Sequence, residues 1–420
     1  MSRPSEAPVH HRITACRACL GETLEEVLDL GAQPLANALP TDPAEFATEQ
    51  RFPLVLFLCR RCGLVQLVDV IRPDVLFAHY LYVTGTSDTI AEHNLRYAAA
   101  VTSELALGPT DLVVEVASND GSLISCFVPH GVRVLGVEPA RNIAKLAEAR
   151  GVPTEVVFFS GAEGARLASV HGKASAIIGN NVLAHVGDPV DFLAGAAAWL
   201  ADDGRAIVEV PYLAEMLDRN EYDTIYHEHL CYFSVTALLT IAERAGLRVV
   251  RVDRVPVHGG SIRTWFAREQ SVPHHAAEVL ALADAERQAG LHDLSRLRAF
   301  AAAAAENRTQ LRALLGRLRA EGARIAAYGA PAKGNTLLNY CGIGTELVEY
   351  TVDRNPLKQD RYLPGQHQPV LHPDVLLERQ PDYLLILAWN FADEIVRQQQ
   401  EYAARGGRFI VPIPMPRILD

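Results

Sequence analysis

The sequence predicts an α/β protein built on a doubly wound sheet, with a small metal-binding module before it and a second α/β domain after it. Three observations support this class. There are two C-x-x-C pairs near the N-terminus, and in two later stretches a buried strand runs into a turn of small residues. A chain of 420 residues is also too long for one typical core. We therefore expect four parts, at residues 12–72, 73–270, 271–322 and 323–420.

The composition is that of an ordinary globular protein, and it disfavours two classes of partner. The net charge is −11 with acids and bases interleaved, whereas nucleic-acid binding favours a basic surface. No apolar run reaches membrane-spanning length, and residues 1–11 are too polar for a signal peptide. Four of the seven cysteines are paired by spacing, which suits a reducing compartment. We expect a cytoplasmic monomer or small homo-oligomer without nucleic-acid or membrane partners.

The N-terminal part contains the paired cysteines Cys16–Cys19 and Cys59–Cys62. Each C-x-x-C places two thiolates on one tetrahedral metal ion, and two such pairs form the closed four-sulfur site typical of structural zinc. Such a site leaves no coordination position for catalysis and stabilises a module that could not bury enough apolar surface alone. The segments 27–30 and 52–58 are expected to be strands of this module.

A stretch rich in hydroxyls and aromatics, residues 77–87, separates this module from an amphipathic helix expected at 88–105. Two interpretations remain open for it. Tyr80 and Tyr82 pack at a domain junction, or one of them contacts a ligand at the mouth of the sheet.

The strand-turn stretch on which the chain is organised is Val113–Leu123, which reads V-V-E-V-A-S-N-D-G-S-L. A second strand at 134–138 ends in Glu138, whose carboxylate is suited to accepting hydrogen bonds from ribose hydroxyls. The turn is not G-x-G-x-x-G, and Asn119 and Asp120 would disfavour a pyrophosphate. A cationic ligand with a ribose, an amino-acid end and no phosphate fits better, and S-adenosylmethionine is such a ligand. The alternative is an ordinary strand-to-helix turn.

The remaining strands of this sheet are expected at 154–159, 174–179, 205–210, 246–256 and 258–266, separated in part by helices at 142–150 and 189–200. Asn180, Asn181 and His185 follow the strand at 174–179. In an open α/β sheet the carboxyl ends of the strands bind ligands. We therefore expect these three side chains beside the cofactor turn.

The pattern breaks at Asp223–Ser234, where two histidines, a glutamate and two tyrosines share one short loop. His227 and His229 could both bind a metal, but the loop lacks the spacing of a helical H-E-x-x-H site. A general base is the better interpretation, because a neutral imidazole can remove a proton from carbon while a neighbouring Glu or Tyr fixes its tautomer. The alternative is a polar loop whose groups satisfy one another.

After a helical stretch at about 272–321, residues 324–336 form the second strand-turn stretch. Its turn contains Lys333 and Gly334, which suit a phosphate. Further strands are expected at 347–352, 383–388 and 410–412, and Asp353 follows the first of them. One acidic and one basic turn suggest a sulfonium cofactor meeting a substrate that carries phosphates. The alternative is a degenerate duplicate that serves only in packing.

Together these motifs resemble the S-adenosylmethionine-dependent sugar C-methyltransferases with an N-terminal zinc-binding domain. The resemblance covers nearly the whole chain and is carried by the paired C-x-x-C, E-V-A-S-N-D-G, N-N-V-L-A-H-V, Y-H-E-H and Y-G-A-P-A-K-G-N. It implies a Rossmann-like methyltransferase sheet and a nucleotide-linked 4-keto deoxysugar substrate, with thymidine diphosphate as the usual carrier. No residue here specifies that base.

The resemblance also implies roles for individual residues. His229 is the implied base, with Tyr226, Glu228, His185 and either Tyr80 or Tyr82 as its companions. The implied cofactor residues are Glu115, Ala117, Asn119, Asp120, Gly121, Glu138, Pro139, Asn180 and Asn181. The implied substrate residues are Ser87, Tyr226, Lys333 and Asn335, and the implied zinc ligands are Cys16, Cys19, Cys59 and Cys62.

The expected reaction follows from the acidity of carbon beside a carbonyl. A 4-keto group acidifies the hydrogen on C3, His229 removes it, and His185 or a tyrosine stabilises the resulting enolate oxygen. The carbanion then accepts the methyl group at C3. The alternatives are methylation of C5, of an oxygen or of a nitrogen, and a zinc-containing binding protein without catalytic activity.

Overall fold

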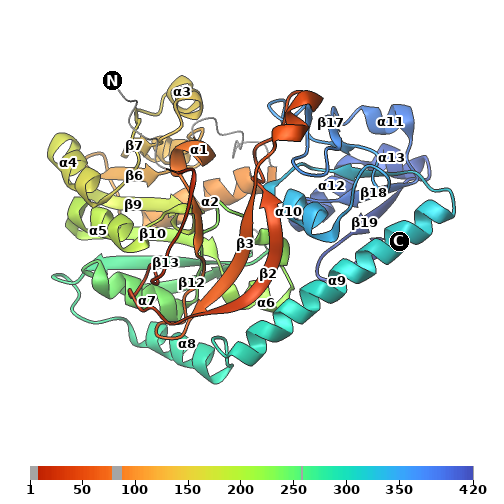
Figure 1. Cartoon of the computed structure of the whole chain (residues 1–420). Helices are drawn as coiled ribbons and strands as arrows, with labels where there is room; N and C mark the ends of the chain where they lie inside the picture. Colours follow the sequence, from red (N-terminus) through yellow and green to blue (C-terminus); the bar gives the residue numbers. More distant parts are fainter. Residues whose placement is uncertain (1–7, 78–87, 257–258, 420) are drawn as a thin grey trace, which may run out of the picture.

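A computed structural model of the chain describes residues 8–77, 88–256 and 259–419. In these residues two seven-stranded sheets carry helices on their faces, and a four-stranded sheet lies between them (Figure 1). The predicted α/β class is confirmed, with a central sheet, an N-terminal module that gathers four cysteines and a second α/β domain. Among the described helices, none is both long enough and apolar enough to cross a membrane.

The four-stranded sheet has the order β11-β4-β3-β2, and all of its pairings are antiparallel. Three of its strands come from the N-terminal module, whereas β11 comes from the loop around His229. A separate pair, β1 and β5, completes the module. The bounds are β1 His10–Arg12, β2 Leu24–Pro34, β3 Arg51–Cys59, β4 Val65–Leu67, β5 Asp69–Ile71 and β11 Cys231–Tyr232, with a 3₁₀ helix at Pro43–Thr48 and α1 at Pro73–Phe77.

The central sheet has the order β12-β13-β10-β9-β6-β7-β8. Strands β10, β9, β6, β7 and β8 are parallel, and β13 and β12 extend the sheet as an antiparallel edge. Because the chain proceeds from β6 to β7 on one side and later to β9 on the other, the topological switch lies beside β6. The bounds are β6 Leu112–Val116, β7 Arg133–Val137, β8 Thr154–Glu155, β9 Ala174–Asn180, β10 Leu200–Pro211, β12 Leu247–Val255 and β13 Ser261–Arg268.

Helices cover both faces of the central sheet, and their apolar sides bury its core. Trp199 at the end of α5 and Tyr97 on α2 are among the largest side chains in this core. The helices are α2 Asp88–Glu104, α3 Arg141–Ala149, α4 Gly161–His171, α5 Pro189–Trp199, α6 Leu213–Asp218 and α7 Val235–Arg244, with 3₁₀ turns at Ile124–His130, Leu183–His185 and Tyr222–Thr224.

The second large sheet has the order β16-β17-β15-β14-β18-β19-β20. The long helix α9 leads to it from the central domain and runs along the lower right of the molecule (Figure 1). The bounds are α8 Ala277–Gln288, α9 Leu294–Ala320, β14 Ile325–Tyr328, α10 Ala332–Cys341, β15 Thr351–Val352, β16 Arg361–Tyr362, β17 Pro369–Leu371, α11 Val375–Arg379, β18 Tyr383–Ile386, a 3₁₀ turn Trp389–Phe391, α12 Ala392–Gln398, α13 Gln400–Ala404, β19 Arg408–Val411 and β20 Arg417–Leu419.

Three expected elements differ from the prediction. The strand expected at 154–159 is only β8, because Val157–Phe159 leave the sheet edge and line a cavity instead. The cofactor turn leads into a 3₁₀ helix rather than an α-helix, and this helix contains Pro129 and ends at Gly131 with φ 77°. The strand expected at 347–352 is reduced to the two residues of β15.

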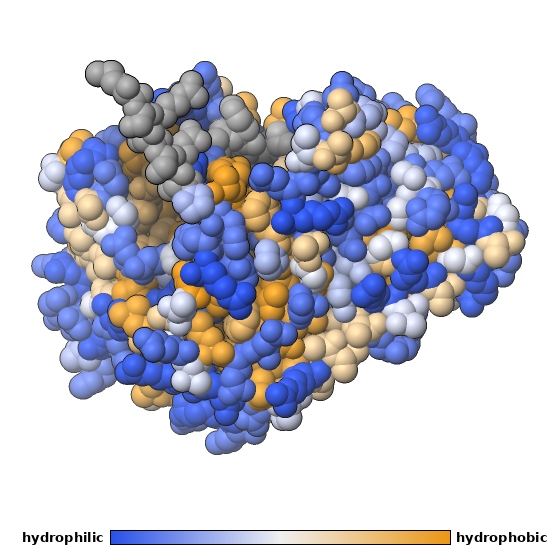
Figure 2. Space-filling model, viewed as in Figure 1, coloured by the Kyte–Doolittle hydropathy of each residue, from blue (hydrophilic) through white to orange (hydrophobic). Residues whose placement is uncertain are grey.

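The surface in the same view is mostly hydrophilic. Hydrophobic residues gather near the middle of this face, where Figure 1 shows β2 and β3 (Figure 2). The four-stranded sheet, called the zinc-module sheet below, packs into the body of the protein and is not an appended domain, because it includes β11 from the loop around His229. Contacts of β2 with α9 and α10 support the same conclusion.

Candidate functional site

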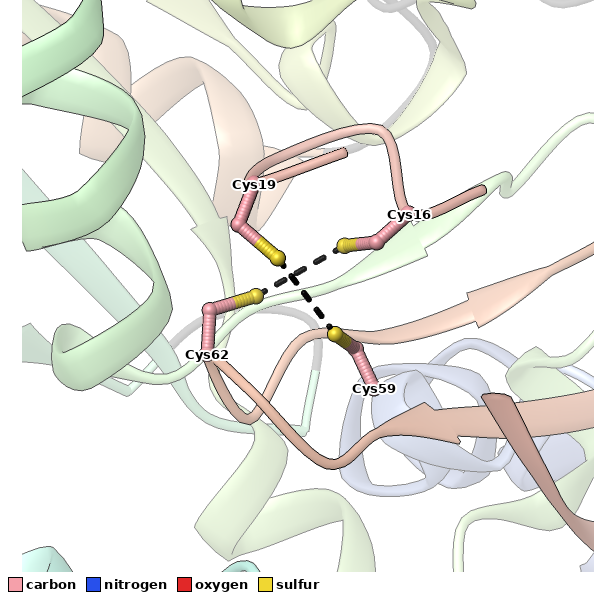
Figure 3. A group of neighbouring side chains, drawn as sticks. All are labelled: Cys16, Cys19, Cys59 and Cys62. Atoms are coloured by element: carbon pink, nitrogen blue, oxygen red, sulfur yellow. Dashed lines mark hydrogen bonds between the residues drawn. The ribbon is translucent and has the colours of Figure 1, made fainter. Parts of the chain in front are cut away.

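The four paired cysteines come together at one end of the zinc-module sheet. Cys16 and Cys19 lie on the loop before β2, Cys59 ends β3, and Cys62 lies in the turn before β4. Their side chains point toward a common centre (Figure 3), and all four sulfur atoms lie within 4.8 Å of one another. The two contacts drawn, Cys16–Cys62 and Cys19–Cys59, measure 3.6 and 3.5 Å.

This geometry fits zinc. Tetrahedral zinc with Zn–S bonds of about 2.3 Å requires sulfurs about 3.8 Å apart, close to the spacing found here. Hydrogen bonds among the thiols lower the pKa of Cys16 and raise the pKa values of Cys59 and Cys62, because the four sulfurs share one small space. Among the described residues no other group of His, Cys, Asp and Glu has metal-ligand geometry. Four protein ligands would fill the coordination shell, which makes this a structural site.

A cavity of about 830 Å³ lies where the carboxyl edge of the central sheet faces that of the C-terminal sheet. Residues from three of the four parts of the chain line it. They include Glu115 and Glu138 of the central sheet, His229 of the loop after β10, Asn37 of the zinc module and Lys333 of the C-terminal domain. The predicted base and the predicted cofactor turn therefore open into the same space.

The cofactor turn leaves β6 in a conformation that favours exposure of its backbone. Ala117 and Asn119 have φ values of 56° and 49°, in the left-handed region usually occupied by glycine. Glu138, at the end of β7, accepts hydrogen bonds from the backbone N–H of Asn119 at 3.0 Å and of Ala140 at 2.8 Å. Glu115 accepts one from Ile124 at 3.0 Å. The two carboxylates thus fix the turn and, together with Pro139, line the cavity.

Two residues expected to bind the cofactor lie elsewhere. Asp120 is fully buried, and its carboxylate pairs with Arg150 at 2.9 Å on the side away from the cavity lining. Because Arg150 neutralises it, the carboxylate does not repel a phosphate in the way the sequence argument assumed. Gly121 has φ 75°, and a Cβ there would lie 3.1 Å from the Cβ of Ala147, so this glycine allows the turn to pack on α3.

The end of β9 carries the expected polar residues to the same edge. Asn180, Asn181 and His185 all line the cavity. Asn181 has φ 55°, and its backbone N–H donates to Glu209 O at 2.7 Å, which holds the turn against β10. Within the described part of the chain, the Oδ1 atom of Asn180 and the Oγ atom of Ser118 are buried without a hydrogen-bond partner. A bound ligand would supply the hydrogen bonds that these two atoms lack.

His229 is held in one tautomer by two neighbours. Its Nδ1 lies 3.0 Å from the backbone carbonyl of Thr224, which can only accept, so Nδ1 carries the proton. Its Nε2 is then the basic nitrogen, and it accepts from the hydroxyl of Tyr226 at 2.6 Å. All three residues line the cavity. The arrangement is that of an oriented general base.

His185 lies edge-on to the ring of His229, with ring centroids 4.7 Å apart. A backbone hydrogen bond of 2.7 Å from Leu230 to Ala184 ties the two segments together. Burial of the ring lowers the pKa of His185 to about 4, so it is neutral at physiological pH. A neutral imidazole can donate one hydrogen bond to a developing oxyanion without competing for the proton.

The zinc-module sheet supports the loop that carries His229. Cys231 and Tyr232 form β11 and pair with Gln66 and Val65 of β4. Nε2 of His227 lies 3.3 and 3.2 Å from the carbonyl oxygens of Phe52 and Pro53, at the start of β3. His227 therefore anchors the loop and, contrary to one interpretation of the sequence, is not paired with His229 on a metal.

Glu228 is bound to the zinc module instead of lining the cavity. Its carboxylate is buried, and both of its oxygens accept from Nδ2 of Asn37, at 2.7 and 2.9 Å. Asn37 itself lines the cavity. The contact positions the loop that carries His229 against the hairpin between β2 and β3. Glu228 is therefore a positioning residue for that loop.

Replacement of this donor by an acceptor tests the contact. Asn37→Asp places a second carboxylate against Glu228, and like charges at this distance cannot both be ionised without distortion. We expect kcat to fall about tenfold, a cost of about 1.4 kcal/mol, with the dissociation constant of S-adenosylmethionine unchanged. Adding Glu228→Gln to this variant restores a donor–acceptor pair and should recover most of kcat. An unchanged kcat in Asn37→Asp would show that the contact is dispensable.

The two substrate residues expected from the second turn differ in placement. Lys333 lines the cavity, with Nζ 3.9 Å from the centre of the Trp389 ring and bonded to Oδ1 of Asn390. Burial lowers the pKa of Lys333 to about 8, although the nearby Asp223 and Glu221 act in the opposite direction. Asn335 does not line the cavity, and its Nδ2 donates to Ala36 O at 2.5 Å, which ties α10 to the zinc module.

Tyr80, Tyr82 and Ser87 lie outside the described residues. The cavity wall also contains polar residues that were not predicted from the sequence, among them His93, Asn94, Glu209, Arg354 and Lys358. The sequence did contain a signal for one of these residues. Glu209 is an acid near the end of a buried strand, the same pattern that identified Glu138.

Comparisons with known proteins agree across nearly the whole chain. Family models match in three adjacent parts: "Putative zinc binding domain" at residues 16–77, "Methyltransferase domain" at 90–252 and "C-methyltransferase C-terminal domain" at 256–414. The chain is also 42% identical to C-methyltransferase NovU of Streptomyces niveus over 410 residues, which covers 97% of each protein.

Similarity to solved structures is much weaker. Magnesium protoporphyrin IX methyltransferase from Synechocystis PCC 6803 is 16% identical, with 43% of this chain and 82% of that chain covered and a TM-score of 0.33. An S-adenosylmethionine-dependent methyltransferase from Clostridium acetobutylicum ATCC 824 is 11% identical, with 42% and 92% covered and a TM-score of 0.35. Similarities this low support no conclusion about this chain.

Proposed function

Because the chain belongs to the S-adenosylmethionine-dependent C-methyltransferases, we propose that it methylates a ring carbon beside the keto group of a nucleotide-linked 4-keto deoxysugar. A carbon must become nucleophilic before it can accept a methyl group, and a neighbouring carbonyl acidifies its hydrogen. We expect C3 to be that carbon, with C5, on the other side of the same carbonyl, as the alternative. The relationship to a C-methyltransferase argues against O-methylation, N-methylation and a non-catalytic binding role.

The observation that carries this proposal is the hydrogen-bonded series Thr224–His229–Tyr226. With Nδ1 bound to the Thr224 carbonyl, Nε2 of His229 is the atom that takes the proton from carbon. The hydroxyl of Tyr226, 2.6 Å from Nε2, occupies the position where the C–H group would approach. When the sugar displaces it, this hydroxyl would donate to the enolate oxygen instead. Neutral His185 is the second donor for that oxygen.

The cofactor would be held by the turn after β6. Glu138 faces the ribose hydroxyls, and the unpartnered Oγ atom of Ser118 adds a polar contact along the same edge. Bound there, S-adenosylmethionine supplies an electrophilic methyl group. The surrounding apolar side chains keep water away from the carbanion.

The nucleotide diphosphate would lie at the C-terminal edge of the cavity. Lys333, Lys358 and Arg354 are the basic side chains on that wall. Lys358 is buried and donates to Ala330 O at 2.7 Å, beside the turn that begins α10. Basic side chains near a helix N-terminus favour phosphate. Thymidine diphosphate is the carrier we expect.

We expect the protein to act in the cytoplasm. All seven cysteines are free thiols in the structure, and four of them form the zinc site. A reducing compartment keeps such thiols available for metal.

Mass spectrometry in deuterated water tests the proposal. The protein and S-adenosylmethionine are mixed with a panel of nucleotide-linked 4-keto deoxysugars that differ in nucleotide and in the substituent at C3, beside matched sugars with a hydroxyl at C4. We expect methylation of keto sugars only, and carbon NMR of the product then distinguishes C3 from C5. Deuterium uptake without methylation would show that the base works on a sugar that is not the substrate. Methylation of the 4-hydroxy sugars would overturn the enolate mechanism.

A further inference from the structure

A polar corner of the cavity wall has no role in the reaction described so far. Glu209 lies near the end of β10, and His93 and Asn94 lie on α2. All three line the cavity, as does Asn180, which is the register partner of Glu209 on the neighbouring parallel strand. Register partners on parallel strands project on the same side of the sheet. The corner therefore combines a carboxylate, an imidazole and two amides.

Glu209 is ionised, and its charge is already balanced. Burial alone would raise the pKa of this carboxyl group, but the nearby His93 and the charge of Arg263 outweigh burial and lower the pKa. Arg263 donates two hydrogen bonds to Oε2 of Glu209, at 3.1 and 2.9 Å. Its guanidinium also lies 4.0 Å from the centre of the Tyr97 ring. The pair is therefore neutral as a unit and does not call for a cationic ligand.

Two atoms in the corner lack a hydrogen bond. Nε2 of His93 is 3.2 Å from Oε1 of Glu209, within ion-pair distance but outside hydrogen-bond alignment. In the described chain, this atom and Oδ1 of Asn180 are buried polar atoms without a hydrogen-bond partner. Leaving such atoms unsatisfied costs about 1–3 kcal/mol each, so a ligand group is expected to satisfy them.

The corner lies on the substrate side of the sheet. Glu209 on β10 is three strands from Glu138 on β7, a distance of about 14 Å at the usual strand spacing. The sulfur of S-adenosylmethionine is only one methylene from its ribose, so a ribose at Glu138 leaves the reacting sugar nearer to β9 and β10. The backbone hydrogen bond from the N–H of Asn181 to the carbonyl oxygen of Glu209 also places the corner beside the segment that carries His185.

We propose that His93 and Glu209, with Asn180, recognise a neutral hydroxyl group on the sugar ring of the substrate. A hydroxyl can accept from His93 while it donates to Oε1 of Glu209 or to Oδ1 of Asn180, whereas an ammonium group can only donate. With Glu209 already paired to Arg263, an ammonium would also leave an unbalanced charge. This inference rests on the proposed function and adds the substituent that the enzyme selects.

The test compares His93→Phe with the unmodified enzyme. Phenylalanine keeps a ring beside Tyr97 and removes both nitrogens, and it leaves the Glu209–Arg263 pair intact. Glu209→Gln is the second variant, with the risk that it leaves Arg263 without a charge partner. The substrates are a 4-keto deoxysugar that is turned over, its analogues deoxygenated at single ring positions, and its amino analogue. The readouts are kcat/KM and the dissociation constant of S-adenosylmethionine.

We expect His93→Phe to lower kcat/KM about 10- to 100-fold for the hydroxylated sugar, and by less than about threefold for one deoxygenated analogue. The dissociation constant of S-adenosylmethionine should not change. Equal losses for every sugar, or preference of the unmodified enzyme for the amino analogue, would overturn the inference. Weakened cofactor binding without discrimination among sugars would assign the corner to the amino-acid end of the cofactor. If the unmodified enzyme methylates no 4-keto sugar, the proposed function itself fails.

Discussion

His229→Gln is expected to lower kcat about 10²- to 10⁴-fold, the usual contribution of a positioned general base. The amide side chain can still donate to Thr224 O and contact Tyr226, so the loop should keep its shape, but it has no basic nitrogen to take a proton from carbon. The dissociation constant of S-adenosylmethionine should be unchanged, because the cofactor turn lies on β6 and β7. Single-turnover assays combined with deuterium exchange measure the proton step directly.

The matched control is His227→Gln, two residues earlier in the same loop. His227 bonds to backbone carbonyls of β3 and does not line the cavity. We expect a lower Tm with kcat within about threefold of the unmodified enzyme, since anchoring and not proton transfer is affected. If the two substitutions reduced kcat equally, His229 would contribute to loop structure and not to proton transfer.

Loss of the metal is expected to have an equally large effect through a different route. Cys62→Ser removes one of four thiolates, and structural zinc contributes about 10 kcal/mol or more to the folding of small zinc modules. Because β11 pairs with β4 of that module, unfolding the module also releases the loop that carries His229. We expect kcat to fall about 100-fold or more, while the cofactor still binds to the central sheet.

The measurements are zinc content, Tm, limited proteolysis of the N-terminal segment and cofactor affinity. Cys126→Ser is the control, because Cys126 lies outside the four-sulfur cluster and donates a hydrogen bond to Ser122 O. It should retain zinc and activity. A zinc-free Cys62→Ser enzyme with full kcat would mean that the central domain can position the base loop without the module.

Much of this architecture could be predicted because its signals are local. A C-x-x-C pair specifies two ligands within four residues, and a strand that ends in Glu138 specifies its own position at the ligand edge. The tautomer of His229 is also local, since Thr224 and Tyr226 are only five and three residues away. Such features depend on short-range geometry that the order of residues determines directly.

The misplaced residues depended on distant partners. Asp120 is held away from the cavity by Arg150, and Asn335 is held by Ala36, about 300 residues earlier in the chain. The role of Glu228 depends in the same way on Asn37, 191 residues away. Side-chain direction in these cases is set by packing between separate segments of the chain, which no pattern in a single segment encodes. The charge balance of Glu209 likewise requires Arg263 from the neighbouring strand.

The pairing of β11 with β4 has a consequence for how such enzymes can be recombined. The base loop belongs to the central domain in sequence and to the N-terminal sheet in structure. A chimera that exchanged only the first eighty residues with a relative would join a foreign β4 to the native β11 and a foreign partner to Glu228. Segments 8–77 and 222–234 therefore have to come from the same parent enzyme when a chimera is made.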